Sequence, residues 1–200
     1  MESIKDIIYQ HLSAYLDDSF ADDYKKKAKQ FAERNPETNQ KYYNNDYYQY
    51  KIDHMPSVGH ERRDGYDYFW YSAMNDFEDI KTVSFHGTLQ DIRACLYSTA
   101  IEDEFGGRYS EKDYPRADEF TIDERPVSDF HSLFCTVLEC VSGGSWLSKE
   151  AADKMAQHLS KEGVRMFFPS FHYGYLGGGL FAFLRESTEE IAILILAGSD

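Results

Sequence analysis

The side chains best suited to chemistry in this sequence are carboxylates, and they concentrate in one stretch. Residues 101–130 hold ten Asp and Glu against four Lys and Arg. Glycoside hydrolysis needs two carboxylates on either side of a sugar at set distances, which sequence neighbours do not provide. Because carboxylates are almost always exposed, a solvated acidic surface that attracts cations is the favoured interpretation. The candidate residues are Glu102, Asp103, Glu104, Glu111, Asp113, Asp118 and Glu119.

Tyrosines form the second candidate set, with five of them among residues 42–50. A tyrosine ring supplies a large, stiff contact area at low entropic cost, which suits a protein interface. Rings in residues 66–71 add to this supply. The alternative for the first group is a tethered polar insertion that contacts nothing. The candidate anchors are Tyr42, Tyr43, Tyr47, Tyr48 and Tyr50.

The charge balance restricts the partners of the chain. With 35 Asp and Glu against 21 Lys and Arg, the formal net charge is -14. Such a chain repels nucleic-acid phosphates and anionic bilayers, so we expect neither nucleic acid nor membrane as a direct partner. The longest apolar run, 191–197, is far shorter than the ~20 residues of a membrane span. A basic protein is the expected partner.

Metal, phosphate and nucleophile motifs are weak, so no cofactor and no metal are expected. His54 and His60 lack a recognised ligand spacing. The glycines of 174–179 precede an apolar strand-like run, which indicates a hairpin turn and not a phosphate loop. Cys95 and Cys135 lie on apolar helical faces, where a buried, inert thiol is the default. Three sparse cysteines and a polar N-terminus predict a cytoplasmic protein without disulfides.

One enzymatic alternative rests on a short motif. Phe85-His86-Gly87-Thr88, at the end of a predicted strand, resembles the histidine-glycine-threonine element of poly-ADP-ribose polymerase-like transferases. Residues 175–182 resemble the glycine-aromatic strand of the same family. The resemblance implies that His86 contacts NAD and that Tyr175 stacks on it. It also implies a catalytic glutamate farther along the chain, where Glu186, Glu189 and Glu190 remain.

Hydrophobic periodicity predicts the elements that position these residues. Capping signals at Ser3 and Ser19 predict separate helices, the second ending near Arg34. From 35 to 65 periodicity is absent, which predicts a long loop or insertion. Pairing strands are expected at 66–71 and 81–86, then helices at 88–106, 126–141 and 148–163.

The C-terminal part changes to strand-like periodicity. Runs at 164–171, 180–184 and 191–197, separated by turn residues, predict an antiparallel meander. No repeat or linker divides the chain. The sequence therefore predicts a single α+β domain over residues 1–200, with helices packed on a mostly antiparallel sheet. We expect a non-enzymatic cytoplasmic module that binds and neutralises a basic partner, as an immunity protein or an anti-defence inhibitor does. Nucleic-acid mimicry is a stricter form of this expectation.

Overall fold

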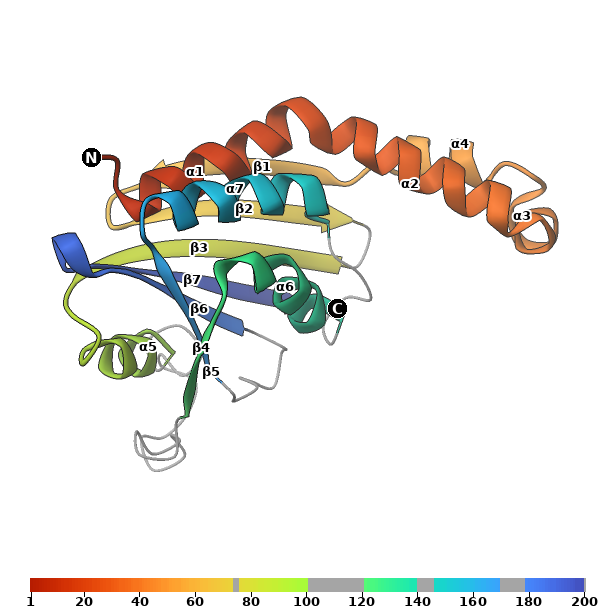
Figure 1. Cartoon of the computed structure of the whole chain (residues 1–200). Helices are drawn as coiled ribbons and strands as arrows, with labels where there is room; N and C mark the ends of the chain where they lie inside the picture. The colour runs from red at the N-terminus through yellow and green to blue at the C-terminus, as the bar shows by residue number, and fades with distance from the viewer. Residues whose placement is uncertain (74–75, 101–120, 140–145, 170–178, 200) are drawn as a thin grey trace, which may run out of the picture.

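A computed structural model describes residues 1–73, 76–100, 121–139, 146–169 and 179–199 of the chain. In this part the chain is a single α+β domain, in which helices pack on one seven-stranded antiparallel sheet (Figure 1). The predicted fold class is thereby confirmed. The strands are β1 (Ser57–Arg63), β2 (Tyr66–Ala73), β3 (Asp76–His86), β4 (Ile122–Arg125), β5 (Arg165–Pro169), β6 (Gly179–Arg185) and β7 (Glu190–Ser199).

The C-terminal strand joins two strand groups into one sheet. The strand order is β1-β2-β3-β7-β6-β5-β4, and every neighbouring pair is antiparallel. The predicted pairing of 66–71 with 81–86 and the predicted C-terminal meander are both present. Because β7 also pairs with β3, placing Leu196 opposite Ile80, the N-terminal strands and the meander share one hydrogen-bonded network.

The central strand β7 is buried on both faces, which explains its uninterrupted apolar sequence. Ala192, Leu194 and Leu196 belong to a large core beneath α1 (Ile4–Ala14), α6 (Phe130–Glu139) and α7 (Lys149–Lys161). Its alternate residues, Ile191, Ile193 and Ile195, face a smaller core with α5 (Ile92–Ala100). Figure 1 shows α1 and α7 side by side over the sheet and α5 on the opposite side.

A buried ion pair attaches the start of α1 to the sheet. Arg185, only 1% exposed, donates from Nη2 to Glu190 Oε2 at 2.8 Å and to the Glu2 carbonyl at 2.7 Å. The other carboxylate oxygen of Glu190 accepts the Ile4 backbone N–H at 2.6 Å. At its start the helix is also capped by Ser3, whose Oγ accepts from the Asp6 backbone N–H. The N-terminus is therefore fixed by contacts distant in sequence.

The predicted break between two separate helices at Ser19 is wrong, whereas the predicted end of the second helix near Arg34 is confirmed. The first helix does not stop before Ser19: it passes through a π-helical turn (Tyr15–Ser19) into α2 (Phe20–Arg34). Ser19 makes no side-chain cap hydrogen bond, because the helix already supplies the backbone partners. As a result, α2 continues outward beyond the sheet (Figure 1).

The predicted long loop at 35–65 is also wrong. It contains α3 (Pro36–Tyr43), α4 (Tyr47–Asp53) and the edge strand β1. Proline at the first helical position starts α3, since its missing N–H needs no partner there. Asn44 and Asn45 take left-handed conformations between the two helices, which asparagine tolerates better than most residues. The sequence signals for these two helices are therefore the proline that starts α3 and the asparagines of the turn, and not an amphipathic pattern.

Candidate functional site

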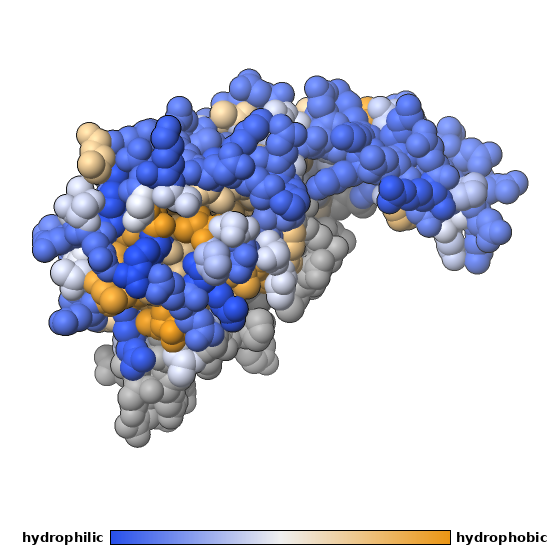
Figure 2. Space-filling model, viewed as in Figure 1, coloured by the Kyte–Doolittle hydropathy of each residue, from blue (hydrophilic) through white to orange (hydrophobic). Residues whose placement is uncertain are grey.

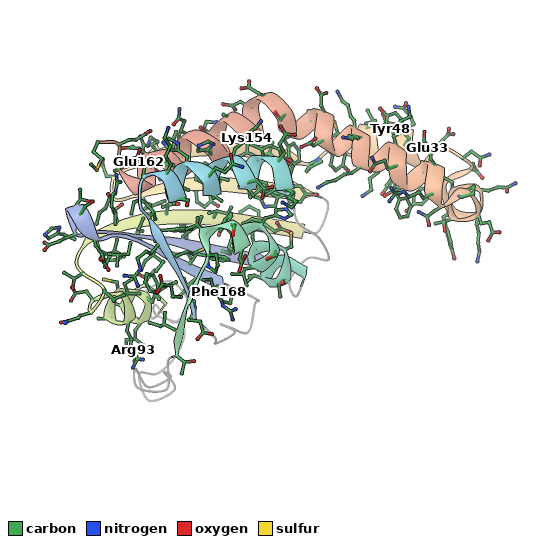
Figure 3. All side chains as sticks on the ribbon, viewed as in Figure 1. Glu33, Tyr48, Arg93, Lys154, Glu162 and Phe168 are labelled. Atoms are coloured by element: carbon green, nitrogen blue, oxygen red, sulfur yellow. The ribbon has the colours of Figure 1, made fainter. Side chains whose placement is uncertain are left out.

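Residues 20–54, which comprise α2, α3 and α4, form a helical projection that we call the arm (Figure 1). Three large hydrophobic side chains are exposed on it: Phe31 (40%), Tyr42 (66%) and Tyr48 (37%). Figure 3 labels Tyr48 on α4 and Glu33 on α2, two helices that pack against each other in the arm. The arm therefore presents rings to solvent at a distance from the main core.

The five predicted tyrosine anchors divide into two groups. Tyr43, Tyr47 and Tyr50 are half-buried in a ring cluster that holds α4 against α2. Ring centroids lie 4.5 Å apart for Phe31 and Tyr47, 4.8 Å for Tyr43 and Tyr47, and 5.2 Å for Tyr43 and Tyr50. Burial, followed by the neighbouring Tyr43, raises the pKa of Tyr47. These three rings stabilise the arm, whereas Tyr42 and Tyr48 stay available for contact.

The predicted acidic residues lie outside the described residues, as does Tyr175. The acidic set comprises Glu102, Asp103, Glu104, Glu111, Asp113, Asp118 and Glu119. The arm itself is not acidic, since it carries seven Lys and Arg with six Asp and Glu. We call the rest of the chain, residues 1–19 and 55–200, the body. It holds 29 Asp and Glu against 14 Lys and Arg, so the net negative charge of the chain comes from the body.

His86 lies at the end of β3 with its side chain 78% exposed. Its Nε2 is 3.2 Å from Glu189 Oε2, and the Gly87 backbone N–H donates to the Glu189 carbonyl at 2.7 Å. Asp91 accepts hydrogen bonds from the backbone N–H and hydroxyl of Thr88, and these bonds lower the pKa of Asp91. The histidine-glycine-threonine element is thus a surface turn that places one histidine beside one glutamate.

The two histidines considered for a metal site belong to different networks. His54 Nδ1 donates to the Tyr50 carbonyl at 2.8 Å, within the arm. His60, on β1, lies 3.0 Å from the Tyr9 hydroxyl through Nδ1 and 3.0 Å from the Asp17 carboxylate through Nε2. Among the residues that the structure describes, no cluster of three His, Cys, Asp or Glu side chains is arranged to hold a metal ion.

A cleft of about 460 Å³ lies where the root of the arm meets α6 and the start of α7. We call it the root cleft. Cys135, on α6, lines the cleft and is half-buried, so the expectation of a buried thiol is wrong for this residue. Residues from three helices and their flanks line the cleft: Asp23, Lys26, Lys27, Gln30, His131, Cys135, Leu147, Ser148 and Lys149.

Sequence reasoning missed the root cleft, although one signal was present. His131 and Cys135 are four residues apart on α6, which places both on one helical face. The lysines of α2 were interpreted as a solvated face that complements the helix dipole. That interpretation could not include Lys149, because the approach of α7 to α2 depends on the tertiary packing.

In comparisons with known proteins, no family model, no curated protein and no solved structure matches this chain. Across the described ranges, none of the helices combines the length and apolar character needed to cross a bilayer.

Proposed function

We propose that this protein is an interaction module that binds and neutralises a basic protein partner, in the manner of an immunity protein or an inhibitor. One observation carries the proposal: the arm projects from the body and exposes Phe31, Tyr42 and Tyr48 to solvent. Exposed aromatic rings of this kind are common anchors in protein interfaces.

The arm and the body supply different parts of the binding energy in this proposal. The body carries the excess of carboxylates, which attracts a cationic partner over distance and raises the association rate. The arm is nearly neutral in net charge, so it neither attracts nor repels a cationic partner strongly, and its exposed rings supply the contact area. Steering by the body and anchoring by the arm together favour a basic partner with an apolar recess.

The test compares the wild-type chain with a Tyr42→Ala, Tyr48→Ala double variant in quantitative pull-downs from cells of the native host. We expect the wild type to retain a protein of basic isoelectric point, and the double variant to retain at least tenfold less, which corresponds to about 1.4 kcal/mol. Raising the salt from about 50 to about 300 mM should weaken the binding further, because exposed charges are screened.

The matched control is Gln40→Ala, which changes an exposed residue of α3 without removing a ring. Binding by this variant should equal that of the wild type. An acidic retained partner, or retention that salt does not change, contradicts electrostatic recognition. Equal retention by the double variant contradicts anchoring through the arm.

The second candidate function, NAD-dependent transfer of ADP-ribose, is supported by the approach of His86 to Glu189. It is tested by titrating the protein with NAD and measuring binding by calorimetry. Binding that His86→Ala abolishes supports the candidate. An absence of binding at millimolar NAD removes it.

A further inference from the structure

The root cleft presents a free thiol to a small molecule. Its volume is about 460 Å³, and its apolar surface comes from Leu147 and the carbon stems of Lys26 and Lys27. Lysine stems can cover apolar contents while their ammonium groups stay in water. The contents best suited to this cleft therefore have an apolar centre and anionic ends.

The thiol has a hydrogen-bond donor beside it. His131 Nε2 lies 3.2 Å from the Leu147 carbonyl oxygen. Because a carbonyl oxygen only accepts, this nitrogen must carry the proton. The same nitrogen is 3.5 Å from Cys135 Sγ, so its N–H can turn to the sulfur when the sulfur is an anion.

The charges of the root cleft favour an anionic ligand, although the chain as a whole is acidic. Among the described residues that line it, Lys26, Lys27 and Lys149 accompany one carboxylate, Asp23. Lys149 also pairs with Asp153 at 2.5 Å, in a contact exposed to solvent. Lys26 and Lys27 add two positive charges to the cleft from α2.

We infer that the root cleft is a modification site, in which Cys135 exchanges with a low-molecular-weight disulfide that carries anionic ends. The Cys135 thiol loses its proton to water, and the thiolate attacks one sulfur of the disulfide. The S–S bond of the reagent breaks, a new S–S bond to Cys135 forms, and the departing thiolate takes up a proton from water. This inference is independent of the proposed binding of a basic protein.

The experiment measures the rate of mixed-disulfide formation by mass spectrometry with peptide mapping. The reagents are oxidised glutathione, which is anionic, hydroxyethyl disulfide, which is neutral, and cystamine, which is cationic. A Cys140→Ser background is used, so that Cys95 and Cys135 are the thiols that can react. We expect Cys135 to react about fivefold faster with oxidised glutathione than with cystamine at low salt, once each rate is divided by the rate measured in urea.

Cys95 provides an internal control. Burial, and then the charge of Asp91, raises the pKa of Cys95, so this thiol should react slowly and without preference for the anionic reagent. In a Lys26→Gln, Lys27→Gln double variant, the ratio of the normalised rates of Cys135 with oxidised glutathione and with cystamine should fall toward one. Lys29→Gln, on the same helix but outside the cleft, should keep the ratio of the wild type.

Three results would overturn the inference. The first is a normalised rate at Cys135 that is no faster with oxidised glutathione than with cystamine. The second is a preference that survives the double lysine substitution. The third is an equal preference at Cys95. A Lys26→Arg, Lys27→Arg variant keeps both charges, so it must retain the preference, and this separates loss of charge from loss of folding.

Discussion

The arm and the body are held together by different kinds of contact. In the body, β6 and β7 are buried on both faces, and Phe181, Ala192 and Leu194 are completely covered. In the arm, only Phe20, Ala28 and Asn39 are buried, and the rings between α2 and α4 stay half-exposed. Figure 2 shows the same difference on the surface, since hydrophobic colour gathers on the body while the arm is coloured mostly hydrophilic.

The stability of the fold therefore depends mainly on the body, whereas the rings that are available for binding lie on the arm. Complete burial of an aliphatic or aromatic side chain contributes about 1.5 to 3 kcal/mol. A partly exposed ring gains only a fraction of this, to which contact with a second ring adds about 0.5 to 1.5 kcal/mol. We therefore expect the body to unfold as one cooperative unit and the arm to open locally at a lower cost. An arm of this kind can change its surface, and its partners, without endangering the sheet.

The largest effect is expected from a cavity in the body. Phe181 lies 5.1 Å, centroid to centroid, from both Phe130 and Phe168. Phe181→Ala should lower the free energy of unfolding by about 3 to 5 kcal/mol, because neighbouring rings cannot fill the space. Urea unfolding followed by circular dichroism measures the change. A loss below about 1 kcal/mol would mean that this core is loosely packed, and the contrast with the arm would disappear.

A ring deletion in the arm should cost less and act locally. Phe31→Ala removes the partner of Tyr47 and should destabilise the arm by about 1 kcal/mol. Hydrogen exchange should then accelerate in residues 20–54 and stay unchanged in β6 and β7. Faster exchange throughout the sheet would show that the arm and the body unfold together.

Acidification should weaken the body through a histidine pair between α1 and α7. His11 Nε2 lies 3.1 Å from His158 Nδ1. Burial, and then the charge of His158, lowers the pKa of His11 below its usual value of 6.5. Glu2 acts in the opposite direction, and Lys154 adds to the lowering. The unfolded chain therefore binds more protons than the folded one just below pH 6.5, so this contribution is complete above that pH and is lost as the pH falls.

The measurement compares urea midpoints at about pH 7.5 and about pH 5.5, on either side of the ordinary histidine pKa. The midpoint should fall more for the wild type than for His11→Gln, which has no proton to gain at this position. Equal falls in the two proteins would show that the pair does not destabilise the folded state on protonation.

The sequence allowed the body to be predicted much better than the arm. Helical spacing of Ile4, Ile8 and Leu12 and the apolar run of β7 both depend on burial, which leaves a periodic or continuous pattern. The arm segment 35–54 lacks such a pattern, because its rings pack on one another and not on a core. The pairing of β7 with β3 was also missing from the prediction, since strand order depends on contacts more than 100 residues apart in sequence.

The candidate site was predicted only in part. Tyr42 and Tyr48 were identified from ring content alone, and both are exposed. The same reasoning could not separate them from Tyr43 and Tyr47, because the direction of each ring depends on how α3 and α4 fold back along α2. Cys135 was assigned to an apolar interior for a similar reason: the cleft beside it exists only after α2 and α7 approach α6.

The smallest effect is expected at the turn that lets α3 and α4 fold back. Asn44 has a φ of 50°, in the left-handed region that glycine adopts without strain. Asn44→Gly should change arm stability by no more than about 0.5 kcal/mol, whereas Asn44→Ala should cost about 1 kcal/mol. Hydrogen exchange within residues 36–53 measures both. If alanine is tolerated as well as glycine, the turn does not fix the arm, and the ring cluster alone must hold α4 against α2. In that case Phe31→Ala should release the whole arm and not only loosen it.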